Sequence, residues 1–245
     1  MPRYVPSSDE ERAFLAAYRK KKYPRPAVSA DVAAFTWRDA TLAVLLIRRG
    51  NFPHRGSWAF PGGFVEVGDC FDDQGEDLAA AASRELHEEC GIAPGSVSLR
   101  QLATFGSPDR DPRTRLITVV HLAILPPAAA DQARPGDDAA HAEWVPLASA
   151  CRLPLAFDHA DILRAAVDRL QADSAHTSIL APLVPRAFTR RELRDVHAAV
   201  WGQGFDARRF AVVFRRLLAD GIVNAMPAAD PPRYRFGRPA RQRPI

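Results

Sequence analysis

The apolar residues of the chain follow two spacings, one typical of strands and one typical of helices. Short, nearly continuous apolar runs such as TLAVLLI predict buried strands. We expect strands over 27–37, 41–50, 96–106, 115–125 and 142–147, with a tight hairpin turn between the first two. The stretch 51–64 is rich in glycine, proline and aromatic residues, which predicts a loop followed by a short strand.

Other segments carry apolar residues at helical spacing. The clearest is 76–90, in which Leu78, Ala82 and Leu86 form one stripe and Gly91 follows as the stop. Further helices are expected over 9–22, over 158–171 with Asp158 as N-cap, and at two places after residue 188. Strands interspersed with helices indicate an α/β domain.

The C-terminal region has the pattern of two capped helices and a hairpin. Thr189 and Glu192 form a capping box before the first helix, and Asp206 is placed to cap the second. The segments IVNAM and RYRF follow, separated by a proline-containing turn. Two helices followed by a β-hairpin predict a winged helix-turn-helix. We therefore divide the chain into an N-terminal helical segment (1–22), an α/β domain (23–172) and a winged-helix-like domain (173–245).

The overall composition is that of a globular protein. The chain has 245 residues, of which 47% are hydrophobic and 25% are charged. The longest apolar run is far shorter than the roughly 20 residues of a membrane-spanning helix, and the first residues show no secretory signal. Cys70, Cys90 and Cys151 have neither metal-binding nor disulfide spacing. These features predict a cytoplasmic protein without a membrane partner.

Charge is distributed unevenly along the chain. From residue 181 onward there are 13 arginines, no lysine and 5 acidic residues, a net charge of +8, whereas the whole chain carries +4. The difference indicates two regions with different partners, and a basic domain is typical of proteins that bind nucleic acid. An arginine-rich genome would produce the same bias without such a partner.

Glu85, Glu88 and Glu89 crowd the end of the helix expected over 76–90. At 100° per residue, Glu88 and Glu89 lie within about 60° of Glu85, so the three carboxylates share one side of the helix. Like charges at this spacing destabilise a helix unless a cation lies among them. Carboxylate oxygens are suitable ligands for Mg²⁺ or Mn²⁺. A solvated acidic face is the alternative.

The surrounding residues resemble the Nudix box, whose pattern is G-x5-E-x7-R-E-U-x-E-E-x-G-U with U aliphatic. Glu76, Arg84 and the run from Glu85 to Ile92 match the second half position by position. Upstream, WAFPGGFVEVG resembles the strand and loop that lead into the box. Seven extra residues separate the two halves, and Asp69 stands where the family has its first glutamate. We interpret these residues as a loop insertion before the helix.

The resemblance implies an α/β/α sandwich with a mixed sheet, in which metal-assisted attack of water cleaves a diphosphate. Glu85, Glu88 and Glu89 would be the metal ligands, and Arg84 would pair with Glu76 and orient Glu85. The general base is left open among the glutamates of the box, Asp137, Asp138 and Glu143.

A second informative stretch, SPDRDPRTR, places three arginines in a loop between two expected strands. Arginine binds phosphate and ribose oxygens well, although a charged surface hairpin would have the same composition. The longer stretch TFGSPDRDPRTRLITVVHLAI resembles the ADP-ribose pyrophosphatase branch of Nudix proteins, which implies ADP-ribose or a related nucleoside diphosphate sugar as ligand. The expected binding residues are Arg49, Phe60, Gly62, Gly63, Arg110, Arg113 and Arg115.

The C-terminal stretches APLVPRAFTRRELRDVHAAVWG and FDARRFAVVFRRLLADGIV resemble the winged helix that this branch often carries. The NrtR family of DNA-binding regulators of NAD metabolism has the same build. The arginines expected to contact DNA phosphates are Arg208, Arg209, Arg215 and Arg216. The segment RFAVV, however, lacks polar groups for reading base edges, so dimer packing is the alternative role.

NrtR proteins generally have degraded Nudix boxes, whereas this chain retains every charged position of the box helix. The resemblance therefore favours a Mg²⁺-dependent hydrolase, with a regulator that senses ADP-ribose-type ligands as the alternative. It also implies a homodimer.

Overall fold

A seven-stranded mixed sheet forms the centre of the computed structural model, which describes residues 6–19, 25–68, 74–134, 139–227 and 230–237. The strand order is β3-β2-β1-β6-β5, with β4 paired to β1 and β7 paired to β2. The strands are β1 (Ala27–Arg38), β2 (Thr41–Arg49), β3 (Trp58–Ala59), β4 (Gly62–Phe64), β5 (Leu99–Phe105), β6 (Leu116–Leu125) and β7 (Ala139–Pro146). Strands β1 and β6 run parallel, and the other pairs are antiparallel.

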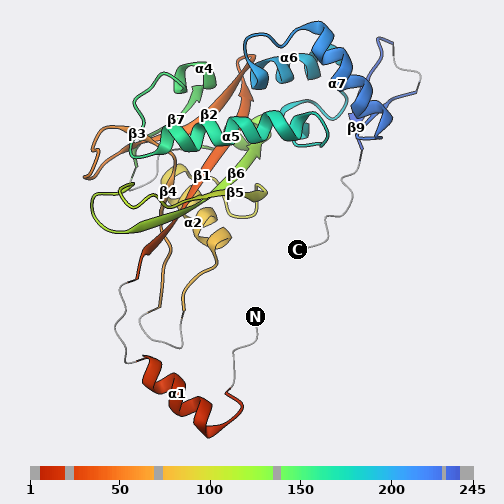
Figure 1. Ribbon diagram of the computed structural model, residues 1–245. Helices are drawn as coiled ribbons and strands as arrows, with labels where there is room; N and C mark the ends of the chain where they lie inside the picture. The colour runs from red at the N-terminus through yellow and green to blue at the C-terminus, as the bar shows by residue number, and fades with distance from the viewer. Residues whose placement is uncertain (1–5, 20–24, 69–73, 135–138, 228–229, 238–245) are drawn as a thin grey trace.

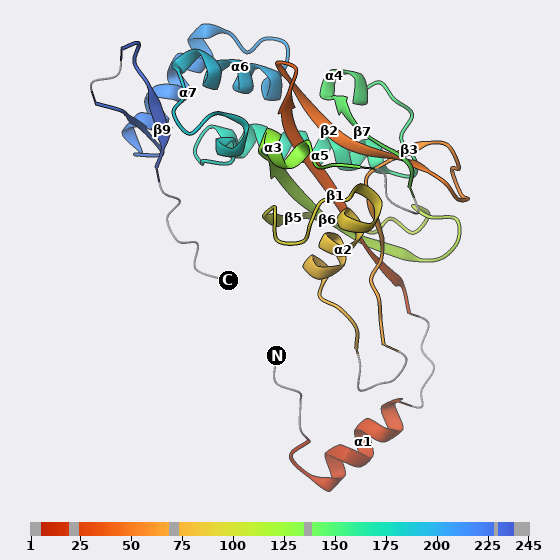
Figure 2. The same ribbon diagram turned by 180° about the vertical axis from the view of Figure 1, so that it is seen from behind.

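Helices cover both faces of this sheet (Figures 1 and 2). They are α2 (Leu78–Cys90) and α3 (Pro127–Ala130) on one face, and α4 (Leu147–Ala150) and α5 (His159–Ser174) on the other. Because side chains alternate along a strand, β1 contributes to two cores. Ala30 and Val32 pack towards α2, and Ala33 and Phe35 pack towards α5. The result is the α/β/α sandwich with a mixed sheet that the resemblance implied.

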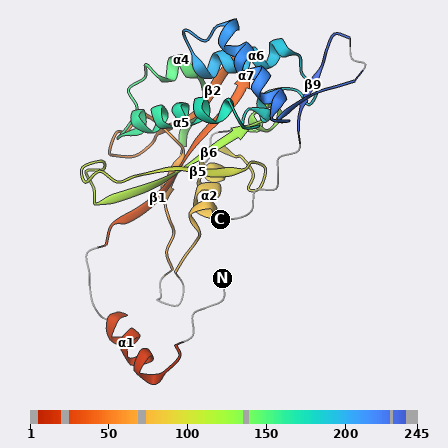
Figure 3. The same ribbon diagram turned by 45° about the vertical axis from the view of Figure 1, so that its right-hand side comes forward.

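Helix α1 (Asp9–Arg19) lies apart from the sheet in all three views (Figures 1–3). It is shorter than the expected helix over 9–22, whose last residues lie outside the described part of the chain. Phe14 on this helix is 64% exposed, so α1 adds little to the hydrophobic core. No helix among the described residues is both long enough and apolar enough to cross a membrane.

The C-terminal region contains the two expected helices and the hairpin. These elements are α6 (Arg190–Trp201), α7 (Ala207–Ala219), β8 (Val223–Ala225) and β9 (Tyr234–Phe236), after a short 3-10 helix, η1 (Ala181–Leu183). The capping box of Thr189 and Glu192 is present, and Asp206 accepts hydrogen bonds from the first turn of α7. Figure 3 shows α6 and α7 beyond the sheet with β9 beside them, an arrangement consistent with a winged helix.

Helix α5 connects the two regions, because it continues to Ser174 and packs against α6. Gln171 donates to the carbonyl of Val200 at 3.1 Å, and the indole of Trp201 donates to the Ser174 hydroxyl at 3.1 Å. Leu170 and Val200 also belong to one hydrophobic core. The C-terminal region is therefore packed onto the α/β domain.

Candidate ligand-binding and catalytic site

Arg84 organises the acidic end of helix α2. Its guanidinium donates to Glu76 at 2.6 Å, to Glu85 at 2.8 Å and to Glu88 at 2.9 Å. The hydrogen bonds from Arg84 lower the pKa of Glu76. The ion pair between Arg84 and Glu76 that the resemblance implied is present, and Arg84 also fixes the direction of Glu85.

The inserted segment is closed at its base by Glu66 and Glu76. The backbone of Glu76 donates to the carbonyl of Glu66 at 3.1 Å, and the Glu66 N–H donates to the Glu76 carboxylate at 2.9 Å. Helix α2 begins at Leu78, two residues later than expected, and Gly91 ends it in the left-handed conformation at φ 68°. The insertion therefore leaves the box helix whole.

Two glycines of β4 allow the carboxylates to approach the sheet. The Gly62 N–H donates to Glu89 at 2.8 Å, and a Cβ at Gly63 would overlap the carboxylate of Glu85. A Cβ at Gly62 would overlap Asp31 on the neighbouring strand. Glycine is required here because no larger residue leaves room for these acids on both sides.

Burial disfavours the charged forms of both inner glutamates. It raises the pKa of Glu89 to about 8, and the charge of nearby Glu85 adds to the shift. Burial also raises the pKa of Glu85, against the opposing effect of Arg84. Two poorly hydrated carboxylates that repel each other would be stabilised by a cation between them.

The donor chemistry of Glu85 and Glu89 fits a hard divalent cation such as Mg²⁺ or Mn²⁺. Within the described ranges, however, no three His, Cys, Asp or Glu side chains are grouped so that they could hold a metal ion. Glu88 is half-exposed and directed to Arg84 instead. The role of the three glutamates as metal ligands therefore stays a prediction.

Glu143 is the one candidate for a general base outside the box that lies among the described residues. Glu143 lies on β7, where its carboxylate contacts the His141 ring at 3.1 Å. It lines neither of the cavities beside the box, and Asp137 and Asp138 lie outside the described residues.

Two adjoining cavities lie beside the glycines. The outer one, of about 430 Å³, reaches Arg84, Glu85 and Glu89, and the inner one, of about 40 Å³, lies against the start of α5. Both are lined by Arg49, Gly62, Gly63, Phe64 and Arg113. A ligand held by the shared arginines could therefore reach the acidic helix on one side and the inner cavity on the other.

Arg49 is the cation best placed to bind an anion. Its guanidinium donates to the carbonyl of Pro53 at 2.9 Å and lies 4.8 Å from the centre of the Phe157 ring. No carboxylate in the described part of the chain forms a salt bridge with it. Burial, together with the nearby charge of Arg113, lowers the pKa of Arg49. A bound phosphate would offset both the burial of this charge and its repulsion from Arg113.

The three arginines of the loop after β5 have different surroundings. Arg110 is buried and forms a bidentate ion pair with Asp158, at 2.6 and 2.9 Å. Asp158 therefore does not cap α5 with its side chain, as we had expected. Arg113 is half-exposed, donates to Asp111 at 2.8 Å and lies over Phe64.

Arg115 lies outside both cavities and donates to the carbonyls of Ser107 and Leu116. Of the three loop arginines, Arg113 is the one that lines both cavities, and it is paired with Asp111 there. Phe60 lines the inner cavity, and its N–H donates to His159 at 2.9 Å.

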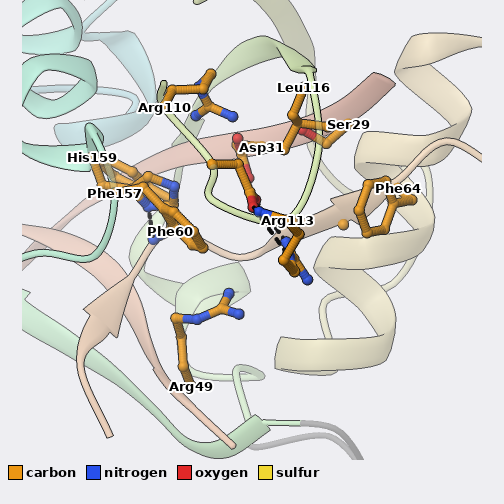
Figure 4. A pocket seen from close by; sticks show the side chains of 13 residues that line it. Ser29, Asp31, Arg49, Phe60, Phe64, Arg110, Arg113, Leu116, Phe157 and His159 are labelled. Atoms are coloured by element: carbon orange, nitrogen blue, oxygen red, sulfur yellow. Dashed lines mark hydrogen bonds and ion pairs between the residues drawn. The ribbon is translucent and has the colours of Figure 1, made fainter. Parts of the chain in front are cut away.

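Sequence reasoning missed seven residues that line the inner cavity, namely Ser29, Asp31, Phe64, Asp111, Leu116, Phe157 and His159. Figure 4 shows Phe60, Phe157 and His159 grouped on one wall, with Asp31 between Arg110 and Arg113. One signal was available, because Asp31 is the single acid in the apolar stretch AVSADVAAF. A charge in a strand buried on both faces indicates function.

The four C-terminal arginines form an exposed basic face on α7. Arg208, Arg209, Arg215 and Arg216 are all exposed, and Val212, on the same face, is 59% exposed. Arg216 pairs loosely with Asp220 at 3.6 Å. This face is free of packing against the rest of the described chain.

The chain is similar in sequence to known proteins. The sequence matches the NUDIX domain over residues 27–166. It is 38% identical to the ADPR responsive transcriptional repressor NtrR of Acinetobacter baylyi over 213 residues, covering 87% of this chain and 80% of that protein. It is 38% identical to the ADP-ribose pyrophosphatase of Methanocaldococcus jannaschii over 143 residues, covering 58% and 73%.

A similar solved structure is that of Shewanella oneidensis NrtR complexed with a 27mer DNA. It has a TM-score of 0.65 and 27% sequence identity, and the match covers 85% of this chain and 92% of that one.

Proposed function

The chain belongs to the Nudix family, and from this premise we propose that it is a DNA-binding regulator whose Nudix domain binds ADP-ribose or a related nucleoside diphosphate sugar. The observation that carries the proposal is the extent of the match. The repressor relative and the DNA-bound structure match this chain across the α/β domain and the basic C-terminal region. The pyrophosphatase relative matches only 58% of the chain.

The exposed face of α7 supports DNA binding. Four arginines on one helical face can contact phosphates on adjacent turns of the backbone. Binding through these contacts would release counterions and would weaken as salt rises. A homodimer, implied by the family, would present two such helices.

Helix α5 connects the ligand cavity to the C-terminal helices, so it could couple ligand binding to DNA binding. Its first residues border the inner cavity, through His159 and the Arg110–Asp158 ion pair. Its last turn holds α6 through Gln171 and Ser174. A ligand that shifts the start of α5 would therefore move α6 and, with it, the basic face of α7.

The test is fluorescence anisotropy of the purified protein with DNA from upstream of its own gene. We expect selective, salt-sensitive binding that ADP-ribose reverses. Equal affinity for unrelated DNA at every salt concentration, or no response to ADP-ribose, would contradict the proposal.

A second candidate function, hydrolysis of the same ligand, is favoured by the retained charges of the box. Glu85 and Glu89 lie beside the outer cavity, and both have raised pKa values, as expected for carboxylates that a divalent cation would stabilise. When bound, Mg²⁺ would neutralise the diphosphate and lower the pKa of a water molecule. Arg49 and Arg113 would hold the diphosphate, and Arg84 would keep Glu85 directed towards the site.

The test of hydrolysis is AMP release from ADP-ribose with Mg²⁺ or Mn²⁺, beside the Glu89→Gln variant. Metal-dependent release that is lost in the variant would establish an enzyme. Binding of ADP-ribose without release of AMP would support the regulator and not the hydrolase.

A further inference from the structure

The inner cavity holds a carboxylate that the diphosphate and metal contacts do not use. Asp31 is 6% exposed, and the hydroxyl of Thr118 donates to its Oδ2 at 2.5 Å. No other described group donates a hydrogen bond to this carboxylate, and no described arginine forms a salt bridge with it. A buried carboxylate can accept several hydrogen bonds, so most of this capacity is left for a bound molecule.

Two further polar side chains line the same cavity. Ser29 lies two residues before Asp31 on the same face of β1, and its hydroxyl makes no hydrogen bond to another described residue. His159 accepts the N–H of Phe60 on Nδ1, and burial lowers its pKa, so the neutral ring carries its proton on Nε2. The cavity thus combines an acceptor, a donor and a hydroxyl.

Size and charge restrict what this cavity can hold. A volume of about 40 Å³ corresponds to roughly three water molecules, so the cavity can hold a few hydroxyl groups but not a whole nucleobase or sugar ring. Arg49, Arg110 and Arg113 line the same cavity and disfavour a bare cation, while Asp31 would repel a phosphate. Neutral hydroxyl groups, which donate and accept, satisfy all of these conditions.

We propose that Asp31, with Ser29 and His159, binds the hydroxyl groups of a pentose that is joined to the diphosphate of the ligand. Arg49 and Arg113 line both cavities, so a diphosphate held there places its attached sugar at the inner one. The assignment rests on the proposed function and specifies which part of the ligand is recognised. The pentose is either the terminal ribose of ADP-ribose or the ribose of its adenosine.

The test is isothermal titration calorimetry with ADP-ribose and with ADP, in EDTA so that no metal-dependent turnover occurs. Asp31→Asn is compared with the wild-type chain and with Asp39→Asn, a matched change at a 92% exposed carboxyl in the following turn. We expect Asp31→Asn to weaken ADP-ribose binding about ten- to hundredfold, the effect of losing a hydrogen bond to a charged group. Asp39→Asn should bind as the wild-type chain does.

The two ligands identify the sugar. If Asp31→Asn loses affinity for ADP-ribose but not for ADP, the site binds the terminal ribose. If the variant loses affinity equally for both ligands, the site binds the adenosine ribose. Wild-type affinity for both ligands in a folded Asp31→Asn variant overturns the assignment alone. If the wild-type chain binds neither ligand, the proposed function fails as well.

Thermal melting shows whether Asp31→Asn is folded. If it is not, Ser29→Ala provides the second variant, for which we expect a loss of about two- to tenfold, as for a neutral hydrogen bond. Unchanged ADP-ribose affinity in Ser29→Ala then overturns the assignment.

Discussion

Arg110 and Asp158 are paired through two hydrogen bonds, of 2.6 and 2.9 Å, between the loop after β5 and the start of α5. The sequence predicted a phosphate-binding arginine and a helix cap at these positions. Asp158 makes no capping hydrogen bond. The two side chains satisfy each other, because a buried guanidinium and a nearby carboxylate are both costly to leave unpaired. The pair fixes the end of α5 that borders the ligand cavity.

Breaking this pair should destabilise the protein strongly. Asp158→Asn would leave the Arg110 charge, whose side chain is 3% exposed, without a partner, at a cost of about 3–5 kcal/mol. Urea denaturation measures the change. The matched control is Asp161→Asn, which breaks the exposed pair with Arg164 on the same helix and should cost less than about 1 kcal/mol. Equal effects of the two variants would contradict the buried role of Arg110.

Gly63→Ala should impair the acidic site specifically. The new Cβ would overlap the carboxylate of Glu85 and displace it from the cavity. We expect at least a tenfold loss in any metal-dependent turnover, measured as AMP release, because an error of about 1 Å in a catalytic group is costly. Gly106→Ala is the control, since its Cβ would meet only ordinary contacts at 3.6 Å. A Gly63→Ala protein with wild-type turnover would show that Glu85 is not needed there.

Stability without metal should fall as pH rises from about 4.5 to 8. The raised pKa keeps Glu89 protonated in the folded state, while the unfolded chain ionises it near pH 4.5, so the folded state binds the extra proton. Glu89→Gln removes this dependence. The free energy of unfolding of the variant, relative to that of the wild type, should therefore increase by up to a few kcal/mol as pH rises from 5 to 8. Urea denaturation in EDTA at both pH values measures the difference, and parallel pH profiles would argue against a buried, neutral Glu89.

Removing arginines from α7 should weaken DNA binding without changing the affinity of the protein for ADP-ribose. Arg208→Ala and Arg215→Ala should each lower the slope of log affinity against log salt by about one, if each contacts a phosphate. Fluorescence anisotropy at several salt concentrations measures the slope. Arg152→Ala, at an exposed arginine of the Nudix domain, should leave it unchanged. Unchanged slopes in both α7 variants would instead favour a dimer-packing role for this helix.

Among the elements, those governed by short-range patterns were predictable from the sequence. The box helix, the stop at Gly91 and the capping box of Thr189 and Glu192 depend on residues within a few positions of one another. The boundaries were less accurate, as α5 extends to Ser174 and α2 begins only at Leu78. Helix ends depend on packing as well as on local sequence.

The sequence alone therefore determined the family, the box helix and the basic C-terminal pattern, because each is written in neighbouring residues. Only the tertiary structure decided which charges share a site. The parallel register of β1 with β6 and the pairing of β1 with β4 bring Asp31 beside Thr118 and Gly62. Packing of α5 on the sheet directs Arg110 inward to Asp158, while Arg113 pairs with Asp111 at the edge of both cavities. Such contacts join residues far apart in the chain, so no local pattern specifies them.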